Sequence, residues 1–349
     1  MDEDTCINCG LCEKVCPILN QADKLSVLEV LAVKNPNEEE RMNSSSGGVF
    51  LPLAREVINK GGVVFGAVYD DSWEVHHVYA EKIEDVYPMM GSKYLQSKIE
   101  NSYKEAERFL KQGREVMFVG SPCQIAGLRT FFRNKEYPNL LAVDFLCHGV
   151  PSPGVWRRYL AETYGGYVAR EQGRLQATAG KNPVLSSGIH YDNPFMRGFL
   201  SDIYLRPSCY ECKCKNGVNH SDLTIGDYWA ARVTDQDFDD DKGVGLVLVN
   251  TSKGKEYFDR LNMTVRKSDL DKANLCNGGF NEHTHAHPKR ALFFALIYQG
   301  KTIKDAVDIC LKISLSSRVK NKTKRLVKGA VKQILGDKGV KAINTALGK

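Results

Sequence analysis

Residues 116–147 of this 349-residue chain read VMFVGSPCQIAGLRTFFRNKEYPNLLAVDFLC. Two apolar runs, Val116–Val119 and Leu140–Phe145, have the length of buried strands, and Gln124–Asn134 between them has the spacing of a helix. Strands that alternate with helices in this way are typical of parallel sheets. The stretch therefore predicts a mostly parallel sheet with covering helices.

Weaker patterns on both sides extend this sheet. Two apolar runs joined at Asp70-Asp71 predict a hairpin. Ala22–Met42 is expected to be a charged connector, and Tyr167–Asp227 to be β-rich and looped. Ser44 to Ser46 are expected to cap the helix that follows them. The further expected elements are strands Val63–Tyr69, Val75–Ala80 and Gly245–Asn250, and helices Val49–Asn59, Tyr103–Lys111, Gly154–Tyr164, Lys255–Leu261, Lys289–Gln299 and Lys301–Leu311.

The N-terminus contains four cysteines in the pattern Cys6-x2-Cys9-x2-Cys12-x3-Cys16, followed by Pro17. This run is typical of bacterial ferredoxins and predicts an iron–sulfur cluster. A structural zinc site is the alternative, but zinc usually takes two separated ligand pairs. We therefore favour a 4Fe-4S cluster on these four thiolates.

The fourth ligand of this cluster is ambiguous. In two-cluster ferredoxins the last cysteine of such a run binds the other cluster, and this chain contains a single run. Either Cys16 closes its own cluster, or a remote cysteine such as Cys276 or Cys310 completes it, or an upstream run has been lost. We favour the last interpretation, and otherwise expect Cys276 and Cys310 to be buried small hydrophobes.

Composition narrows the class of protein. No apolar stretch is long enough to span a membrane. The chain has eleven cysteines and no export signal, which favours a reducing compartment, so we expect a cytoplasmic location. The net charge of +6 arises in residues 316–349, where ten Lys and Arg face one acid; this tail carries +9 and the remainder −3. A basic amphipathic tail predicts peripheral membrane contact, with a solvated or disordered tail as the alternative. Residues 316–349 contain no aromatic residue that could stack on a base, so nucleic acid is not an expected partner.

A second set of cysteines follows the two central strands. Cys123 comes after the first strand and Cys147 after the second, and neighbouring parallel strands bring such loops to one crevice. Cys209 and Cys212 add a C-x2-C pair, for which a zinc site or redox dithiol is the alternative. Because electrons from an N-terminal cluster need an acceptor, we favour a second iron–sulfur centre.

Several motifs together resemble the coenzyme F-420 hydrogenase/dehydrogenase beta-subunit family, over roughly residues 1–300. The motifs are Ser45-Ser46-Gly47-Gly48, Gly91-Ser92-Lys93-Tyr94, Gly120-Ser121-Pro122-Cys123-Gln124, Cys147-His148-Gly149-Val150-Pro151-Ser152-Pro153, Cys209–Cys212 and Ser221–Trp229. The resemblance implies a flavoprotein with FAD and 4Fe-4S clusters, a ferredoxin or other redox partner, and a small-molecule substrate, with coenzyme F-420 or another deazaflavin as one candidate. It places second-cluster ligands at Cys123, Cys147, Cys209 and Cys212, with Cys214 as an extra thiol.

The expected fold class is α/β with α+β elements: a short 4Fe-4S ferredoxin-like N-terminal segment, then a mixed, partly parallel sheet with covering helices. The expected domains are a ferredoxin-like segment at 1–30, an N-terminal α/β domain at 31–165, a C-terminal domain with the second cysteines at 166–315, and a basic tail at 316–349. Two other functions stay open. One is an electron-transfer subunit without its own substrate site; the other is a zinc-binding, non-redox protein linked to polysaccharide biosynthesis.

A flavin site must differ from the usual dinucleotide fold because the chain has no GxGxxG motif. Backbone N–H groups and hydroxyls at predicted helix starts could hold a phosphate, and a lysine and a ring could contact the flavin. His148 is a candidate proton donor to the substrate, with orientation of the cysteine loop as the alternative. The candidate flavin contacts are Ser45, Ser46, Gly47, Gly48, Gly91, Ser92, Lys93, Tyr94, Gly120, Ser121, Gln124 and Asp227.

Overall fold

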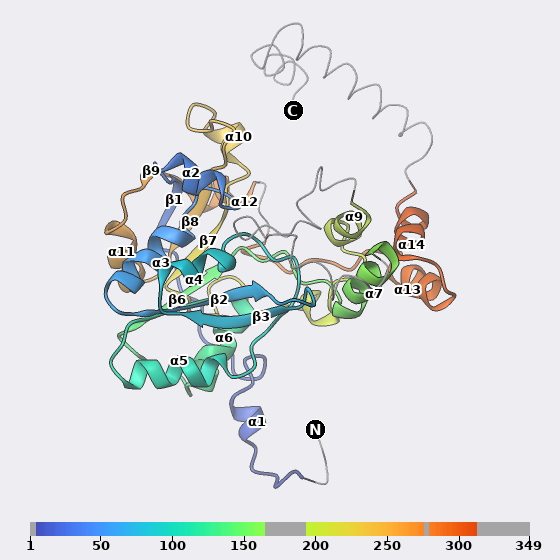
Figure 1. The fold of residues 1–349 in the computed structure, drawn as a ribbon, viewed down its shortest axis with the longest axis horizontal. Helices are drawn as coiled ribbons and strands as arrows, with labels where there is room; N and C mark the ends of the chain where they lie inside the picture. Colours follow the sequence, from blue (N-terminus) through green and yellow to red (C-terminus); the bar gives the residue numbers. More distant parts are fainter. Residues whose placement is uncertain (1–4, 165–192, 276–278, 313–349) are drawn as a thin grey trace, which may run out of the picture.

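The computed structural model describes residues 5–164, 193–275 and 279–312. In these ranges nine strands form one sheet in the order β4-β3-β2-β5-β6-β7-β8-β1-β9 (Figure 1). The strands are β1 Glu29–Lys34, β2 Val63–Tyr69, β3 Val75–Ala80, β4 Ser97–Lys98, β5 Val116–Gly120, β6 Leu140–Phe145, β7 Leu223–Asp227, β8 Gly245–Val249 and β9 Thr264–Lys267.

The centre of the sheet is parallel. Strands β2, β5, β6 and β7 run in one direction, with Gly120 opposite Asp144 in the β5–β6 register. The pairs β2–β3, β7–β8, β8–β1 and β1–β9 are antiparallel. The carboxyl ends of β2, β5, β6 and β7 therefore share one edge of the sheet, which is where ligands bind in parallel sheets.

Helices cover both faces of this sheet (Figure 1). Alternate strand residues pack against α5 and α6 on one face and against α3 and α11 on the other. A separate apolar cluster joins α7, α9, α13 and α14 beside the sheet. The helices are α1 Leu11–Lys14, α2 Glu38–Met42, α3 Phe50–Asn59, α4 Ile83–Val86, α5 Ser102–Lys111, α6 Pro122–Phe131, α7 Pro153–Tyr164, α9 Pro194–Leu200, α10 Ala231–Thr234, α11 Ser252–Asp259, α12 Leu270–Asn274, α13 Arg290–Tyr298 and α14 Ile303–Cys310.

The predicted fold class is confirmed, and three local predictions are wrong. The expected connector at Ala22–Met42 contains β1, whose Leu31, Ala32 and Val33 are buried between β8 and β9. The described part of the expected β-rich region, residues 193–227, contains helix α9 and one strand, β7, while residues 167–192 lie outside the described residues. The serines do not cap α3, because its N-cap is Val49. Strands from both sides of residue 165 belong to the same sheet.

No helix among the described residues is long and apolar enough to cross a membrane.

Candidate functional site

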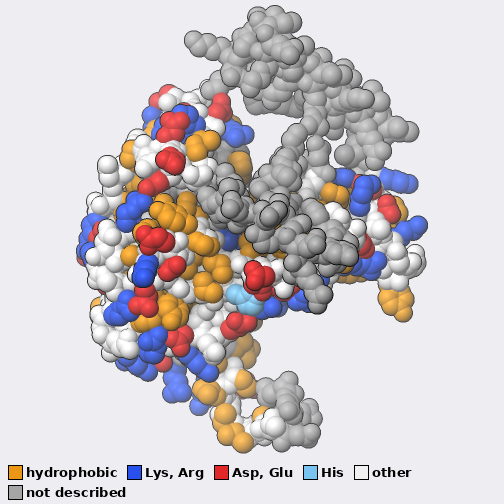
Figure 2. All heavy atoms as spheres, viewed as in Figure 1, with side chains coloured by type: hydrophobic (Ala, Val, Ile, Leu, Met, Phe, Trp, Pro, Cys, Tyr) orange, Lys and Arg blue, Asp and Glu red, His pale blue; other side chains and the backbone are white. Residues whose placement is uncertain are grey.

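The N-terminal cysteines lie on a segment that projects from the body of the molecule (Figures 1 and 2). Cys6, Cys9 and Cys12 are exposed, and Cys16 is half-buried. Helix α1 follows Gly10, whose φ of 66° is the left-handed conformation that glycine adopts without strain. The candidate cluster ligands are therefore accessible from outside the protein.

The base of this segment is attached near the second cysteine set. The His220 ring lies 2.6 Å from the Asp23 carbonyl, and the Leu25 N–H donates to the Gly217 carbonyl at 3.2 Å. Cys16 lies close enough to Cys214 to contribute to its raised pKa. The two sets of cysteines thus approach one another at Cys16 and Cys214.

The sheet topology brings Cys123 and Cys147 together as the sequence predicted. Cys123 lies in the first turn of α6, where the Ser121 hydroxyl is 3.2 Å from its sulfur, and Cys147 follows β6. Burial raises the pKa of Cys147 to about 12, and Cys123 adds to this effect. Cys123 is open to solvent, yet desolvation by its surroundings raises its pKa as well. The neutral thiol is therefore favoured at both positions unless a nearby cation compensates the charge of the thiolate.

Cys209 and Cys212 complete this group from a separate loop. The Val150 N–H donates to the Cys209 sulfur at 3.4 Å, so the loop after Cys147 packs on Cys209. A hydrogen bond from Cys214 lowers the pKa of Cys212 to about 6, against the effect of burial. The buried Cys214 shows the opposite shift, because its thiol bonds to Cys212.

The four predicted second-cluster cysteines are therefore neighbours, with Cys214 beside them. Among the described residues, no three His, Cys, Asp or Glu side chains are arranged to hold a single metal ion. A 4Fe-4S cluster differs from one ion because each of its four thiolates binds a different iron. Cys310 is buried, as expected of a small hydrophobe, while Cys276 and the basic tail lie outside the described residues.

A small, partly open pocket lies beside Cys123 and Cys147, since their chain neighbours Pro122 and Leu146 line it. Asp144 and Lys215 line it, together with Asn219 and Thr224. Asp144 is 3% exposed and accepts a hydrogen bond from Asn219 at 2.8 Å. Its Oδ1 has no hydrogen-bond partner among the described residues, although the Thr224 and Ser221 hydroxyls offset part of the effect of burial on its pKa. Burial raises the Asp144 pKa to about 6.

We expect Asp144→Asn to stabilise the protein at pH 8. Because the folded pKa is about 6 and the ordinary value 3.8, the stability that Asp144 contributes is complete below pH 4 and lost as pH rises through 6. The substitution should recover on the order of 2–3 kcal/mol at pH 8, seen as a melting temperature higher by roughly 5 °C. Thermal unfolding from pH 4 to 8 checks this, with exposed Asp71→Asn as the control. Parallel curves for Asp144→Asn and the unsubstituted protein would contradict it.

The candidate flavin contacts form a second group at the same edge of the sheet. The Ser92 N–H donates to the Ser45 hydroxyl at 2.8 Å, which joins the two predicted loops. Asp227, at the end of β7, interacts with Ser46 and with Tyr94: the hydrogen bond from Ser46 lowers the Asp227 pKa against burial, and Asp227 adds to the raised Tyr94 pKa.

Lys93 lies between Ser92 and Tyr94 in the chain and is half-buried. Its Nζ donates to the carbonyl oxygens of Pro88 at 2.9 Å and Met90 at 2.7 Å. Desolvation lowers its pKa to about 7. Lys93 can therefore gain or lose its proton near neutral pH, and an anion bound nearby would favour the charged form.

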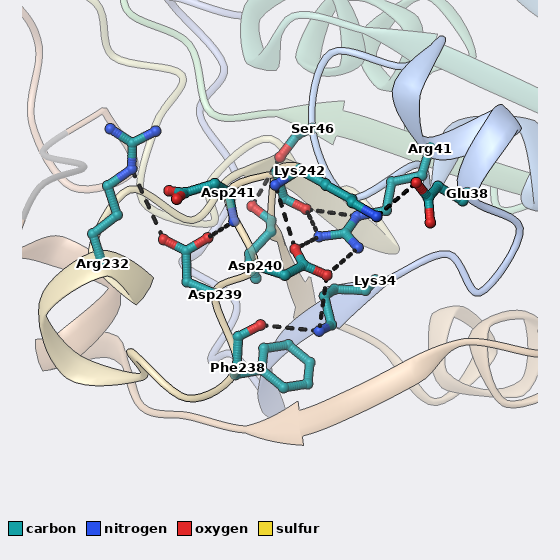
Figure 3. A network of polar contacts seen from close by, with 12 residues as sticks. Lys34, Glu38, Arg41, Ser46, Arg232, Phe238, Asp239, Asp240, Asp241 and Lys242 are labelled. Carbon is teal, nitrogen blue, oxygen red and sulfur yellow. Dashed lines mark hydrogen bonds and ion pairs between the residues drawn. The ribbon is translucent and has the colours of Figure 1, made fainter. Parts of the chain in front are cut away.

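An ion-pair network that the sequence did not reveal holds the serine loop (Figure 3). Arg41 donates to Asp240 at 2.8 Å and to the Gly243 carbonyl at 2.8 Å, and Ser46 donates to the Val244 carbonyl at 2.8 Å. A Cβ atom at Gly47 would lie 2.4 Å from backbone atoms of β1 and β8, so only glycine fits there. Arg41 and Asp240 are 199 residues apart, and no local signal could have paired them.

Gly120, Ser121 and Gln124 have a structural role in the start of α6. The Ser121 N–H donates to Gln124 Oε1 at 2.9 Å, and Gln124 Nε2 donates to the Ser97 carbonyl at 3.3 Å. These contacts fix the turn that presents Cys123. Gln124 thus positions the candidate ligand Cys123.

His148 and Phe199 connect the two groups. The His148 Nε2 lies 2.6 Å from Asp202 Oδ1, and the exposed ring contacts the buried Phe199 ring with centroids 5.2 Å apart. Phe199 also contacts Tyr94, with centroids 5.6 Å apart. The cysteine loop and the candidate flavin loops are therefore separated by one aromatic ring. Sequence reasoning missed Phe199 and Asp202, which lie in the region expected to be β-rich.

Comparison with known proteins confirms the resemblance predicted from the motifs. Residues 113–271 match the family described as the C-terminal part of the beta subunit of coenzyme F420 hydrogenase/dehydrogenase, and residues 1–18 match the 4Fe-4S binding domain. A subunit of the F(420)H(2) dehydrogenase of Methanosarcina mazei is 25% identical over 259 residues, which cover 73% of this chain and 69% of that protein. A xenon-derivatised structure of the F420-reducing [NiFe] hydrogenase complex from Methanosarcina barkeri contains a similar chain, with 16% identity and a TM-score of 0.48, over 83% of this chain and 91% of that one.

Proposed function

We propose that this chain, whose residues 113–271 carry the C-terminal region of the coenzyme F420 hydrogenase/dehydrogenase beta-subunit family, is an iron–sulfur flavoprotein oxidoreductase. Electrons pass between a redox partner and a small organic substrate by way of 4Fe-4S clusters and FAD. The observation that carries the proposal is the convergence of four thiols, from three separate loops, beside a second group of side chains suited to a flavin.

The donor set fits a second cluster. Cys123, Cys147, Cys209 and Cys212 are free thiols, the soft ligands that iron–sulfur clusters take. Cys16 and Cys214 bring the N-terminal segment close to this set. We therefore assign one cluster to Cys6, Cys9, Cys12 and Cys16 and a second to the converging thiols, so that electrons have a short path between them.

The serine and lysine loops fit FAD. The Ser45 hydroxyl, in the loop before α3, accepts a hydrogen bond from the Ser92 N–H, and the neighbouring Lys93 supplies a cation for a phosphate. Tyr94 and Asp227 lie between this cradle and Phe199. FAD would supply the conversion between one-electron cluster steps and two-electron substrate chemistry.

The sequence relative suggests the first substrate and partner to try. Because that relative is a subunit of an F(420)H(2) dehydrogenase, we propose a deazaflavin of the F420 type as substrate and further redox subunits or a ferredoxin as partners. Peripheral membrane contact through residues 316–349, a cytoplasmic location and the division into domains at residues 30, 165 and 315 stay predictions.

Anaerobic purification of the full chain tests the proposal. It predicts about eight irons and eight sulfides per chain, one FAD released on denaturation, and little zinc. Iron without flavin would favour an electron-transfer subunit that lacks its own substrate site. A colourless preparation with zinc and no iron would favour the non-redox alternative and overturn the proposal.

We expect His148→Gln to lower F420H2 oxidation with a viologen acceptor by about 10²-fold, which is the usual contribution of a positioned proton donor. Asp202→Asn should have a smaller effect, because Asp202 holds the His148 ring through one hydrogen bond. Iron and FAD contents should match the unsubstituted protein. If His148→Gln instead loses iron at unchanged turnover per cluster, His148 orients the cysteine loop and transfers no proton.

A further inference from the structure

Lys215 places a buried positive charge among the second-cluster cysteines. It directly follows Cys214, it is 7% exposed, and it lines the pocket that also contains Asp144. Its charge offsets part of the rise that burial causes in the pKa of Cys147 and Cys209, and it helps to lower the pKa of Cys212. Among the described residues no carboxylate lies within ion-pair distance of Lys215, and Asp144 is the acidic residue that shares its pocket.

A short segment fixes the position of this ammonium. Lys215 Nζ donates to the Glu282 carbonyl at 2.7 Å, and the Asn216 N–H donates to the Phe280 carbonyl at 2.9 Å. Gly279, in the same segment, packs on Cys147, since a Cβ there would lie 3.3 Å from the Cys147 carbonyl oxygen. The segment from Gly279 to Glu282 therefore contacts the candidate ligand Cys147 at one end and Lys215 at the other.

A buried cation is costly unless an opposite charge compensates it. The candidates are Asp144 in the same pocket and the thiolates, and the Lys215 charge acts on three of the four thiols. A cluster held by four thiolates is negatively charged and gains one further negative charge on reduction, and charge and burial are what set cluster potentials.

We propose that Lys215 compensates the charge of the second cluster and raises its reduction potential, which favours electron transfer from the N-terminal cluster. The inference rests on the proposed function. In the step concerned, one electron leaves the N-terminal cluster, which is oxidised, and enters the second cluster, which is reduced. No bond breaks and no proton moves. Lys215 acts through its charge and touches no substrate.

Redox titration of the full chain, followed by electron paramagnetic resonance, tests this role. In Lys215→Met the reduction equilibrium of the second cluster should fall about tenfold, or about 59 mV for one electron, while the N-terminal cluster keeps its potential. Lys215→Arg should keep the potential near that of the unsubstituted protein. Lys213→Met is the matched control, because Lys213 is an exposed neighbour that carries the same charge.

Lys215→Gln decides the matter if the methionine variant fails to fold, because glutamine can still donate to the Glu282 carbonyl. An unchanged potential in a neutral variant with full iron content would overturn the proposal, as would an equal shift in Lys213→Met. Absence of a second cluster from the unsubstituted protein is a different result, since iron analysis would then contradict the proposed function itself.

Discussion

Cys147→Ser should lose about four irons per chain while it keeps the N-terminal cluster. Serine offers a harder oxygen in place of the soft thiolate that iron–sulfur clusters require. Cys147 is half-buried between β6 and the segment that begins at Gly279. With the second cluster removed, F420H2 oxidation with the viologen acceptor should fall to background, although dithionite still reduces the N-terminal cluster.

Two matched variants sharpen this result. Cys310→Ser replaces a buried cysteine on α14, far from the candidate ligands in sequence, and should keep all iron. Cys9→Ser should lose the other four irons and leave the second cluster. Iron and sulfide analysis with paramagnetic resonance distinguishes the three. Full iron content in Cys147→Ser would show that Cys147 is not a cluster ligand and would contradict the proposed second cluster. An equal loss of iron in Cys310→Ser would show that replacing any buried cysteine disturbs the fold.

The sequence predicted the strands that carry local signals. Strands β5 and β6 are buried on both faces, so they appear as continuous apolar runs, and their alternation with helices indicates a parallel sheet. From that topology alone, the meeting of Cys123 and Cys147 could be expected. The strand β1 was missed because charged residues surround it and its partners, β8 and β9, come more than 200 residues later.

The rest of the candidate site depends on long-range contacts. Arg41 and Asp240 hold the serine loop, Phe199 connects the two groups, and Lys215 enters the cysteine set through its bond to Glu282. None of these residues has a motif, and each acquires its role from a partner that only the fold supplies. Gln124, by contrast, belongs to a motif, but part of its role is structural: it shapes the turn that presents Cys123.

Lys93→Met should weaken FAD binding by about 10- to 100-fold, which corresponds to the loss of a hydrogen bond to a charged group. The expected pH dependence is sharper evidence. Burial lowers the Lys93 pKa to about 7, so in the flavin-free protein the side chain is charged below pH 7 and neutral above it. An anionic phosphate or reduced flavin binds the charged form, and above pH 7 binding must therefore take up a proton.

The affinity of the flavin-free protein for FAD should consequently be constant below about pH 7 and fall by up to tenfold per pH unit above it. In Lys93→Met this decline should disappear, because no proton is then taken up. Fluorescence titration between pH 6 and 9 measures both effects, and exposed Lys98→Met, in the short strand β4, is the control for charge alone. Should Lys93→Met bind FAD as tightly as the unsubstituted protein at pH 6, the lysine would serve only to bond the carbonyls of Pro88 and Met90, and the flavin cradle would have to be sought elsewhere along this edge of the sheet.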